Sequence, residues 1–271
     1  MNLPKLQQLL LDSLSEDDSK ANAADKQIAQ LTAQDPKLAI SLHLQNLTSK
    51  PLHQSVSGSI LELKNLANRA VFDISKIGDA EFQTYLKKSL LDSLSRTDFD
   101  QSDLDVLASL VPNVASRYVF KGEWNDYASS LLSICKNGKV GGLITLKDSL
   151  NSKLIKYETY QDEINSILTN SFSNPKTQLY ALTILFAAVS HSEFVEKLQG
   201  FGKSVVQLLK VCPTSDLNLV MSALSAFVEH HKDFFNPVKP ELRDALLAIS
   251  TKQGVLARVK RLATALVDSL K

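Results

Sequence analysis

Pairs of neighbouring apolar residues recur along this chain at a nearly constant interval. Successive pairs begin 33 to 47 residues apart, with a mean of about 39. A polar break and a second apolar pattern of helical period follow each pair. A unit of this length can bury its apolar face only against its neighbours, so the pattern predicts a stack of helix pairs, an α-solenoid. The recurring pairs are Leu10-Leu11, His43-Leu44, Leu90-Leu91, Leu131-Leu132, Ile167-Leu168, Leu208-Leu209 and Leu246-Leu247.

The helical patterns themselves fall into seven pairs. They are expected at 3–14 with 17–34, 36–48 with 53–74, 79–94 with 102–119, 124–136 with 139–153, 159–171 with 175–190, 193–210 with 214–231, and 239–250 with 253–270. We therefore predict an all-α fold, an α-solenoid of about seven HEAT-type helix pairs in a right-handed superhelix. With no linker rich in Gly or Ser, residues 1–271 should form one continuous array. Pro112 falls inside a helical pattern and should kink or break it.

The charge balance bears on the class of partner. Thirty Lys and Arg against 29 Asp and Glu give a net charge of +1, so no overall field favours nucleic acid or an anionic membrane. No apolar run reaches the roughly 18–20 residues that span a bilayer, and the N-terminus lacks the pattern of a secretory signal. We expect a soluble intracellular protein that binds neither nucleic acid nor membrane.

Motifs for metal binding or nucleophilic chemistry are missing from the sequence. Cys135 and Cys212 occupy places that leucines hold in other repeats, so we expect buried small hydrophobes without a disulfide. His230 and His231 point about 100° apart on a helix, which argues against zinc, and His43 is expected in the core or at its boundary. No phosphate loop, HExxH, GxSxG or CxxC pair appears. We predict no enzyme, with no catalytic residue, no metal and no cofactor.

The last helical pattern carries an unusually wide apolar stripe, which predicts a helix facing two directions. Terminal repeats normally present a polar outer face, so we expect the chain to be the N-terminal part of a longer solenoid. An oligomer that buries this face is the alternative. The stripe comprises Val255, Leu256, Val259, Leu262, Ala263, Leu266 and Val267.

Two stretches carry a resemblance to a known family. The run ANAADKQIAQLTAQDPKLAISLHLQNL, followed by SGSILELKNLANRAVF, resembles the N-terminal region of the importin-β (karyopherin-β) family, with Leu63-Lys64-Asn65 in place of the family's Leu-Lys-Asn. The run VPNVASRYVFKGEWNDYASSLLSICKNG resembles the family's third repeat, where a tryptophan, here Trp124, opens a helix leading to an apolar pair. The resemblance implies the N-terminal HEAT-repeat region of a nuclear transport receptor.

Helix 53–74 has two faces at about 100° per residue. The core face comprises Leu63, Leu66 and Ala70, and the opposite arc comprises Lys64, Asn65, Asn68 and Arg69. In the resembled family, second helices of the first repeats bind the small GTPase Ran in its GTP form. The resemblance therefore implies Lys64, Asn65 and Arg69 as Ran contacts, through charge-assisted and amide hydrogen bonds. An ordinary solvated helix face is the alternative reading of the same residues.

The resemblance also implies partners and a location. These are GTP-loaded Ran, cargo proteins, and nucleoporin phenylalanine-glycine segments between outer helices, in a protein that shuttles between cytoplasm and nucleus. A general HEAT scaffold or adaptor for another protein fits the repeats equally well. A HEAT-like DNA glycosylase would need a basic concave track and aromatic side chains for the damaged base. The charge of +1 and the single tryptophan argue against that enzyme.

Overall fold

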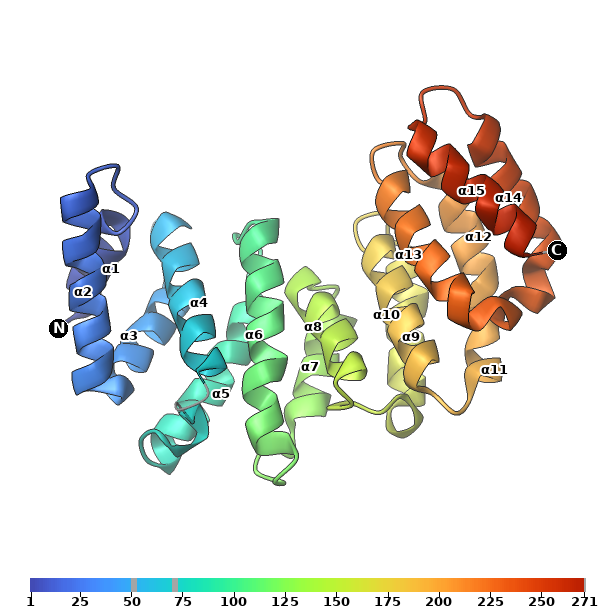
Figure 1. Cartoon of the computed structure of the whole chain (residues 1–271). Coiled ribbons are helices and arrows are strands. Elements are labelled where there is room, and N and C mark those ends of the chain that lie inside the picture. Colours follow the sequence, from blue (N-terminus) through green and yellow to red (C-terminus); the bar gives the residue numbers. More distant parts are fainter. Residues whose placement is uncertain (50–52, 70–72, 271) are drawn as a thin grey trace. The chain divides into compact units, whose positions relative to one another are not determined.

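The computed structural model describes residues 1–49, 53–69 and 73–270, and within these residues the regular structure is entirely helical. The chain divides into two compact units, Met1–Leu154 and Ile155–Lys271. The first unit holds four helix pairs and the second holds three (Figure 1). The predicted all-α fold with seven helix pairs is thereby confirmed.

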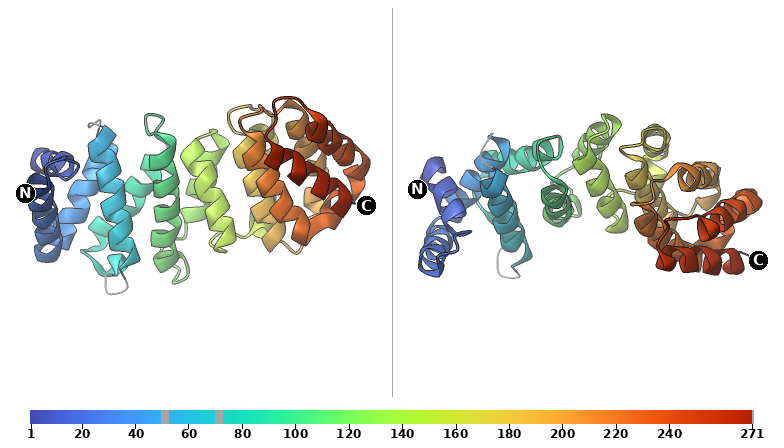
Figure 2. Two further views of the ribbon diagram at one scale, coloured as in Figure 1. Left: turned by 45° about the horizontal axis from the view of Figure 1, so that its top comes forward. Right: turned by 90° about the horizontal axis from the view of Figure 1, so that it is seen from above.

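In the first unit, one layer consists of the first helix of each pair and the other layer of the second helices (Figures 1 and 2). The first helices contact one another in order, as do α4, α6 and α8 among the second helices. The first layer is α1 (Leu3–Asp12), α3 (Pro36–Thr48), α5 (Ala80–Leu94) and α7 (Tyr127–Lys136). The second layer is α2 (Asp18–Gln34), α4 (His53–Asn68), α6 (Gln101–Val119) and α8 (Val140–Asn151), and the short helix η1 (Ile74–Lys76) precedes α5.

The second unit repeats this arrangement. Its first helices are α9 (Gln161–Phe172), α12 (Gly202–Val211) and α14 (Lys239–Thr251), and its second helices are α10 (Gln178–His191), α13 (Leu217–His231) and α15 (Ala257–Ser269). Short helices connect them: η2 (Tyr157–Thr159), α11 (Val195–Leu198), η3 (Gln199–Phe201) and η4 (Lys232–Val238). The helix predicted at 193–210 is therefore divided into three pieces.

Aspartates begin several of these helices because their carboxylates satisfy backbone N–H groups of the first turn. Asp17 accepts from Ser19 and Lys20, and Asp35 accepts from Leu38 just before Pro36. Asp79 and Asp100 cap α5 and α6 in the same way. The polar breaks seen in the sequence are thus the helix starts.

Of the kink or break predicted at Pro112, the break is wrong. Helix α6 runs without interruption from Gln101 to Val119, and Pro112 is buried within it. The residues around it, Leu110, Val111 and Val114, are at most 1% exposed. Burial of this segment in the core outweighs the loss of one backbone hydrogen bond that proline imposes.

The final apolar stripe is largely buried within the second unit. Val259, Ala263 and Leu266 are at most 4% exposed, and α15 packs against both α13 and α14. Leu256, at 64%, is the stripe's markedly exposed member. The wide stripe packs against two neighbouring helices within the same unit, which agrees with the predicted helix facing two directions.

Candidate protein-binding surface

Helix α4 buries one face and exposes the other, as its pattern predicts. Leu63 and Leu66 are at most 1% exposed, whereas Lys64 is half-buried and Asn65 is exposed. Arg69 is exposed too, but it follows Asn68, the last residue of the helix. Two of the three predicted contact residues therefore lie on the helix and the third just beyond its end. Ala70, which was assigned to the core face, lies outside the described residues.

The helix predicted to reach residue 74 ends at Asn68 instead. Arg117 of α6 donates from Nη2 to the carbonyl oxygen of Ala67 at 2.6 Å. A guanidinium at a helix C-terminus also complements the partial negative charge there. The neighbouring repeat thus contacts the last turn of α4, which no pattern within residues 53–74 could indicate.

Glu62 adds a negative charge to the exposed face of α4, beside the positive charges of Lys64 and, just past the helix end, Arg69. Burial raises the pKa of its carboxyl group, and the negative charge of Asp25 on α2 raises it further. The positive charge of Arg69 and a hydrogen bond from the Asn65 side chain both lower this pKa, but not enough to cancel the rise. We call Glu62, Lys64, Asn65, Asn68 and Arg69 the α4 surface. It offers a carboxylate, an ammonium group, two amides and a guanidinium, so it suits a partner with a matching pattern rather than a uniformly charged one.

The α4 surface continues onto the next repeat. Asn113 of α6 donates from Nδ2 to Oδ1 of Asn68 at 2.6 Å, and Arg117 also lies 3.7 Å from a carboxylate oxygen of Asp73. Asn68 is exposed and Asn113 is half-buried. Asn113 and Arg117 lie in the run that resembles the third repeat, but nothing in that run indicates their contacts with α4, so sequence reasoning missed them.

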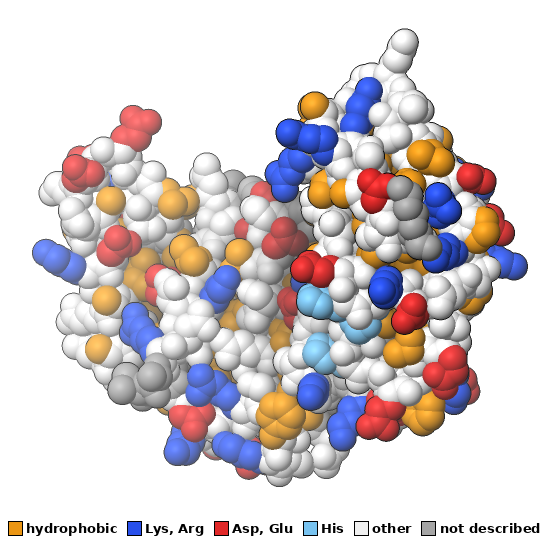
Figure 3. Space-filling model, turned by 45° about the vertical axis from the view of Figure 1, so that its right-hand side comes forward, with side chains coloured by type: hydrophobic (Ala, Val, Ile, Leu, Met, Phe, Trp, Pro, Cys, Tyr) orange, Lys and Arg blue, Asp and Glu red, His pale blue; other side chains and the backbone are white. Residues whose placement is uncertain are grey.

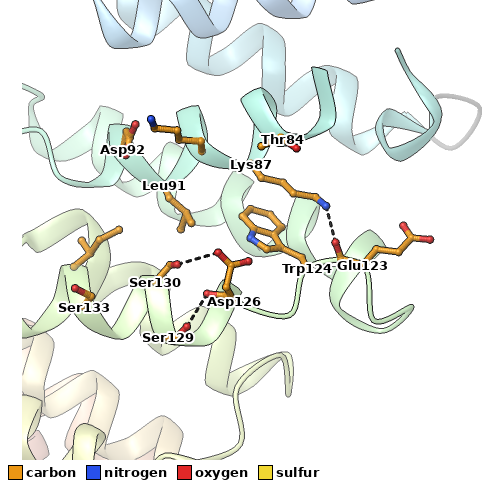
Figure 4. A pocket seen from close by; sticks show the side chains of 12 residues that line it. Thr84, Lys87, Leu91, Asp92, Glu123, Trp124, Asp126, Ser129, Ser130 and Ser133 are labelled. Carbon is orange, nitrogen blue, oxygen red and sulfur yellow. Dashed lines mark hydrogen bonds between the residues drawn. The ribbon is translucent and has the colours of Figure 1, made fainter. Parts of the chain in front are cut away.

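A groove of about 730 Å³ lies on the other layer, between α5 and α7 (Figure 4). Leu91, Trp124 and Ile134 provide its apolar part. Lys87 and Lys88 line one side, and serines of α7 line the other. Both helices are first helices of their pairs, so the groove runs between two adjacent repeats.

Trp124 packs between these repeats and is 3% exposed. Its ring meets Tyr118 and Tyr127 edge-on, with centroids 6.0 and 5.0 Å away. The Nζ of Lys87 lies 4.4 Å from the centre of the Tyr118 ring. The same Nζ donates a hydrogen bond to the Glu123 carbonyl oxygen at 2.6 Å. The indole lies between Lys87 and Asp126 at the edge of the groove (Figure 4). The structure begins α7 at Tyr127, so Trp124 stands just before the helix it was expected to open.

The remaining candidates of the sequence have structural roles. Cys135 and Cys212 are free and buried, which confirms that prediction, and burial raises the pKa of the Cys212 thiol to about 11. His231 lies 3.3 Å from the Ser190 hydroxyl and stacks on Phe227. In the described part of the chain, no three side chains of the metal-binding types are grouped so that they could hold an ion. None of the helices described there has the length and hydropathy needed to cross a bilayer.

Charges of both signs are interspersed on the face of the molecule shown in Figure 3. The second helices of the first unit carry both signs of charge, for example Lys64 and Arg117 together with Asp25 and Glu62. A groove for a phosphate backbone would collect one sign of charge.

Comparison with solved structures identifies the architecture. A crystal structure of importin β superposes on 98% of this chain with a TM-score of 0.79 and 14% sequence identity. The fold is an importin-β-like HEAT-repeat solenoid. A structure of Kap95p, whose binding induces the switch loops of RanGDP to adopt the GTP-bound conformation, superposes on 100% of the chain with a TM-score of 0.62 and 15% identity.

This importin-β-like chain spans 33% and 41% of the length of those two proteins. No family model matches its sequence, and no curated protein matches it. The resemblance read from the two sequence stretches is confirmed at the level of the fold.

Proposed function

We propose that this chain is a segment of a nuclear transport receptor that binds GTP-loaded Ran and takes part in transport of proteins between cytoplasm and nucleus. The observation that carries the proposal is the superposition on importin β and Kap95p over nearly the whole chain. The proposal takes the seven helix pairs as one continuous array over residues 1–271. The protein then acts by binding, without catalysis.

Ran would bind at the α4 surface. Lys64, Asn65 and Arg69 would form charge-assisted and amide hydrogen bonds with the GTPase. Lys64 and Asn65 lie on a second helix with their side chains accessible, as a contact requires. Cargo would bind elsewhere on the array, and release would follow from the coupling free energy between the cargo and Ran sites.

The groove between α5 and α7 would receive nucleoporin phenylalanine-glycine segments. It lies between first helices of neighbouring repeats, and its apolar part, Leu91 with Trp124 and Ile134, suits an aromatic side chain. This proposed site and the α4 surface belong to opposite layers of the first unit, so the two partners would not compete directly.

The test is binding of the purified chain to immobilised Ran, loaded once with a non-hydrolysable GTP analogue and once with GDP. We expect selective retention by the GTP form, and a loss of about tenfold in affinity for Lys64→Glu, since an attractive contact becomes a repulsive one. Lys203→Glu, at an exposed position on α12, is the matched control and should bind like the unchanged chain. Equal or absent retention of the two nucleotide forms would refute the proposal and favour a HEAT scaffold for another protein.

A further inference from the structure

We propose that Asn68 and Asn113 together read the main chain of an extended, acidic loop on the bound GTPase. The inference rests on the proposed function and extends its binding surface from α4 onto α6. It assigns a partner-binding role to Asn113, a residue of the third repeat. We call the two residues the amide pair.

The amide pair bridges two second helices that are 45 positions apart in sequence. Its hydrogen bond from Asn113 Nδ2 to Asn68 Oδ1 is 2.6 Å long and solvent-accessible. One turn further along α6, Arg117 donates to the carbonyl of Ala67, so two contacts fix the same pair of helices. The amides are therefore held in place before any partner arrives, which lowers the entropic cost of binding.

Each carboxamide keeps unused hydrogen-bonding groups. An asparagine side chain has two N–H donors and a carbonyl oxygen that can accept two hydrogen bonds. The mutual bond uses one donor of Asn113 and one acceptor position of Asn68. No other side-chain hydrogen bond of either amide is recorded for the described residues. A donor from Asn68 and an acceptor from Asn113 thus remain available side by side at the surface.

A donor beside an acceptor is the complement of one residue of extended main chain, which presents C=O and N–H. Helical and paired-strand segments of a partner have already satisfied these groups internally. An irregular or extended loop has not. The amide pair therefore favours a loop over a helix as the bound element.

The charges around the amide pair indicate the side chains of that loop. Lys64 lies one helical turn before Asn68 on α4 and forms no ion pair within the described parts of the chain. Arg117, one turn after Asn113, already has Asp73 and the Ala67 carbonyl as partners. Lys64 and the exposed Arg69, which directly follows Asn68, are therefore the cations beside the pair, and a carboxylate on the loop would complement them.

A competing account is that the amide pair only ties repeats two and three together. Two substitutions separate these accounts. Asn113→Leu removes the bond and the acceptor. Asn113→Asp retains a hydrogen bond between the two helices, because the Asn68 amide can rotate and donate to the new carboxylate. The substitution nevertheless presents only acceptors and a negative charge to the partner at position 113.

The experiment measures the affinity of each variant for Ran loaded with the non-hydrolysable GTP analogue, together with unfolding in urea. We expect both variants to bind at least tenfold more weakly, while Asn113→Asp unfolds at nearly the same urea concentration as the unchanged chain. Asn236→Asp, at an exposed position in η4, controls for the added charge and should bind normally.

Normal binding by Asn113→Asp would overturn the inference and leave the amide pair as a tie between repeats, with the proposed function intact. Failure of the unchanged chain to bind either form of Ran would instead refute the proposed function, and the inference would fall with it.

Discussion

His43 should make the first unit sensitive to mild acid. The side chain is completely buried in a polar cluster between α1, α3 and α4. Its Nδ1 lies 3.1 Å from the Ser59 hydroxyl, which accepts a hydrogen bond from Asn46 at 3.0 Å. Gln7 donates to the other end of the Asn46 amide at 2.9 Å. The second ring nitrogen, Nε2, has no hydrogen-bond partner in the described residues.

Burial lowers the pKa of His43 to about 4, from an ordinary value of 6.5. The unfolded chain therefore takes up a proton on this ring at a higher pH than the folded chain does. The stability that the neutral ring contributes is complete above pH 6.5 and is lost as the pH falls toward 4. Between pH 7 and pH 5 only the interval below 6.5, about 1.5 units, contributes, and at about 1.4 kcal/mol per pH unit it should cost about 2 kcal/mol of stability at this residue.

The assay compares the unchanged chain with His43→Gln, which does not titrate in this range, in urea unfolding followed by circular dichroism at pH 7 and pH 5. The carboxylates are common to both chains, so their titration cancels in the difference. Relative to His43→Gln, the unchanged chain should lose about 2 kcal/mol between the two pH values. His191→Gln, at an exposed position, is the control and should give a difference close to zero. A pH-independent difference for His43→Gln would refute the argument from burial.

Two further substitutions test the contacts between repeats. Arg117→Ala removes a charge-assisted hydrogen bond at the end of α4 and should cost about 1–3 kcal/mol of stability. Amide hydrogen exchange should become faster in the last turn of α4. Unchanged exchange there would contradict this role of Arg117. Trp124→Ala empties a site that is 3% exposed and should cost about 3–5 kcal/mol. Since Trp124 is the single tryptophan, weak quenching of its fluorescence by acrylamide in the unchanged chain checks the burial independently.

The repeated apolar pairs predicted the fold because they report a local property, the buried stripe at the end of each first helix. Leu90, Leu131 and Ile167 are all at most 1% exposed. Even the degenerate pair follows the rule, since His43 and Leu44 are both fully buried. The last pair is a partial exception, because Leu247 is 47% exposed. Helical period and capping residues therefore sufficed to place seven helix pairs.

The candidate surface was predictable only in part. Lys64 and Asn65 follow from the period of their own helix. Asn113 and Arg117 do not, because their partners lie 45 and 50 positions earlier. Such contacts depend on how one repeat is aligned against the next, which a pattern within a single helix does not encode. The same limit hid the contact that a side chain of the next repeat makes with the last turn of α4.

Arginines of the third repeat hold both helices of the second at their C-terminal ends. Arg96 donates to the carbonyl oxygens of Leu47 and Ser49 at the end of α3 and pairs with Asp98. Arg117 does the same for Ala67 at the end of α4. The last carbonyl groups of a helix have no hydrogen-bond partner within that helix. Each arginine of the third repeat therefore donates to such carbonyl groups of the second repeat.

Repeats two and three are consequently joined by charged hydrogen bonds as well as by apolar packing. Such bonds fix direction more strictly than apolar contact does. The angle between α4 and α6 should therefore vary less than packing alone would allow. The binding surface proposed for these two helices would then be ordered before a partner arrives, and the free-energy cost of ordering it would fall on folding rather than on binding.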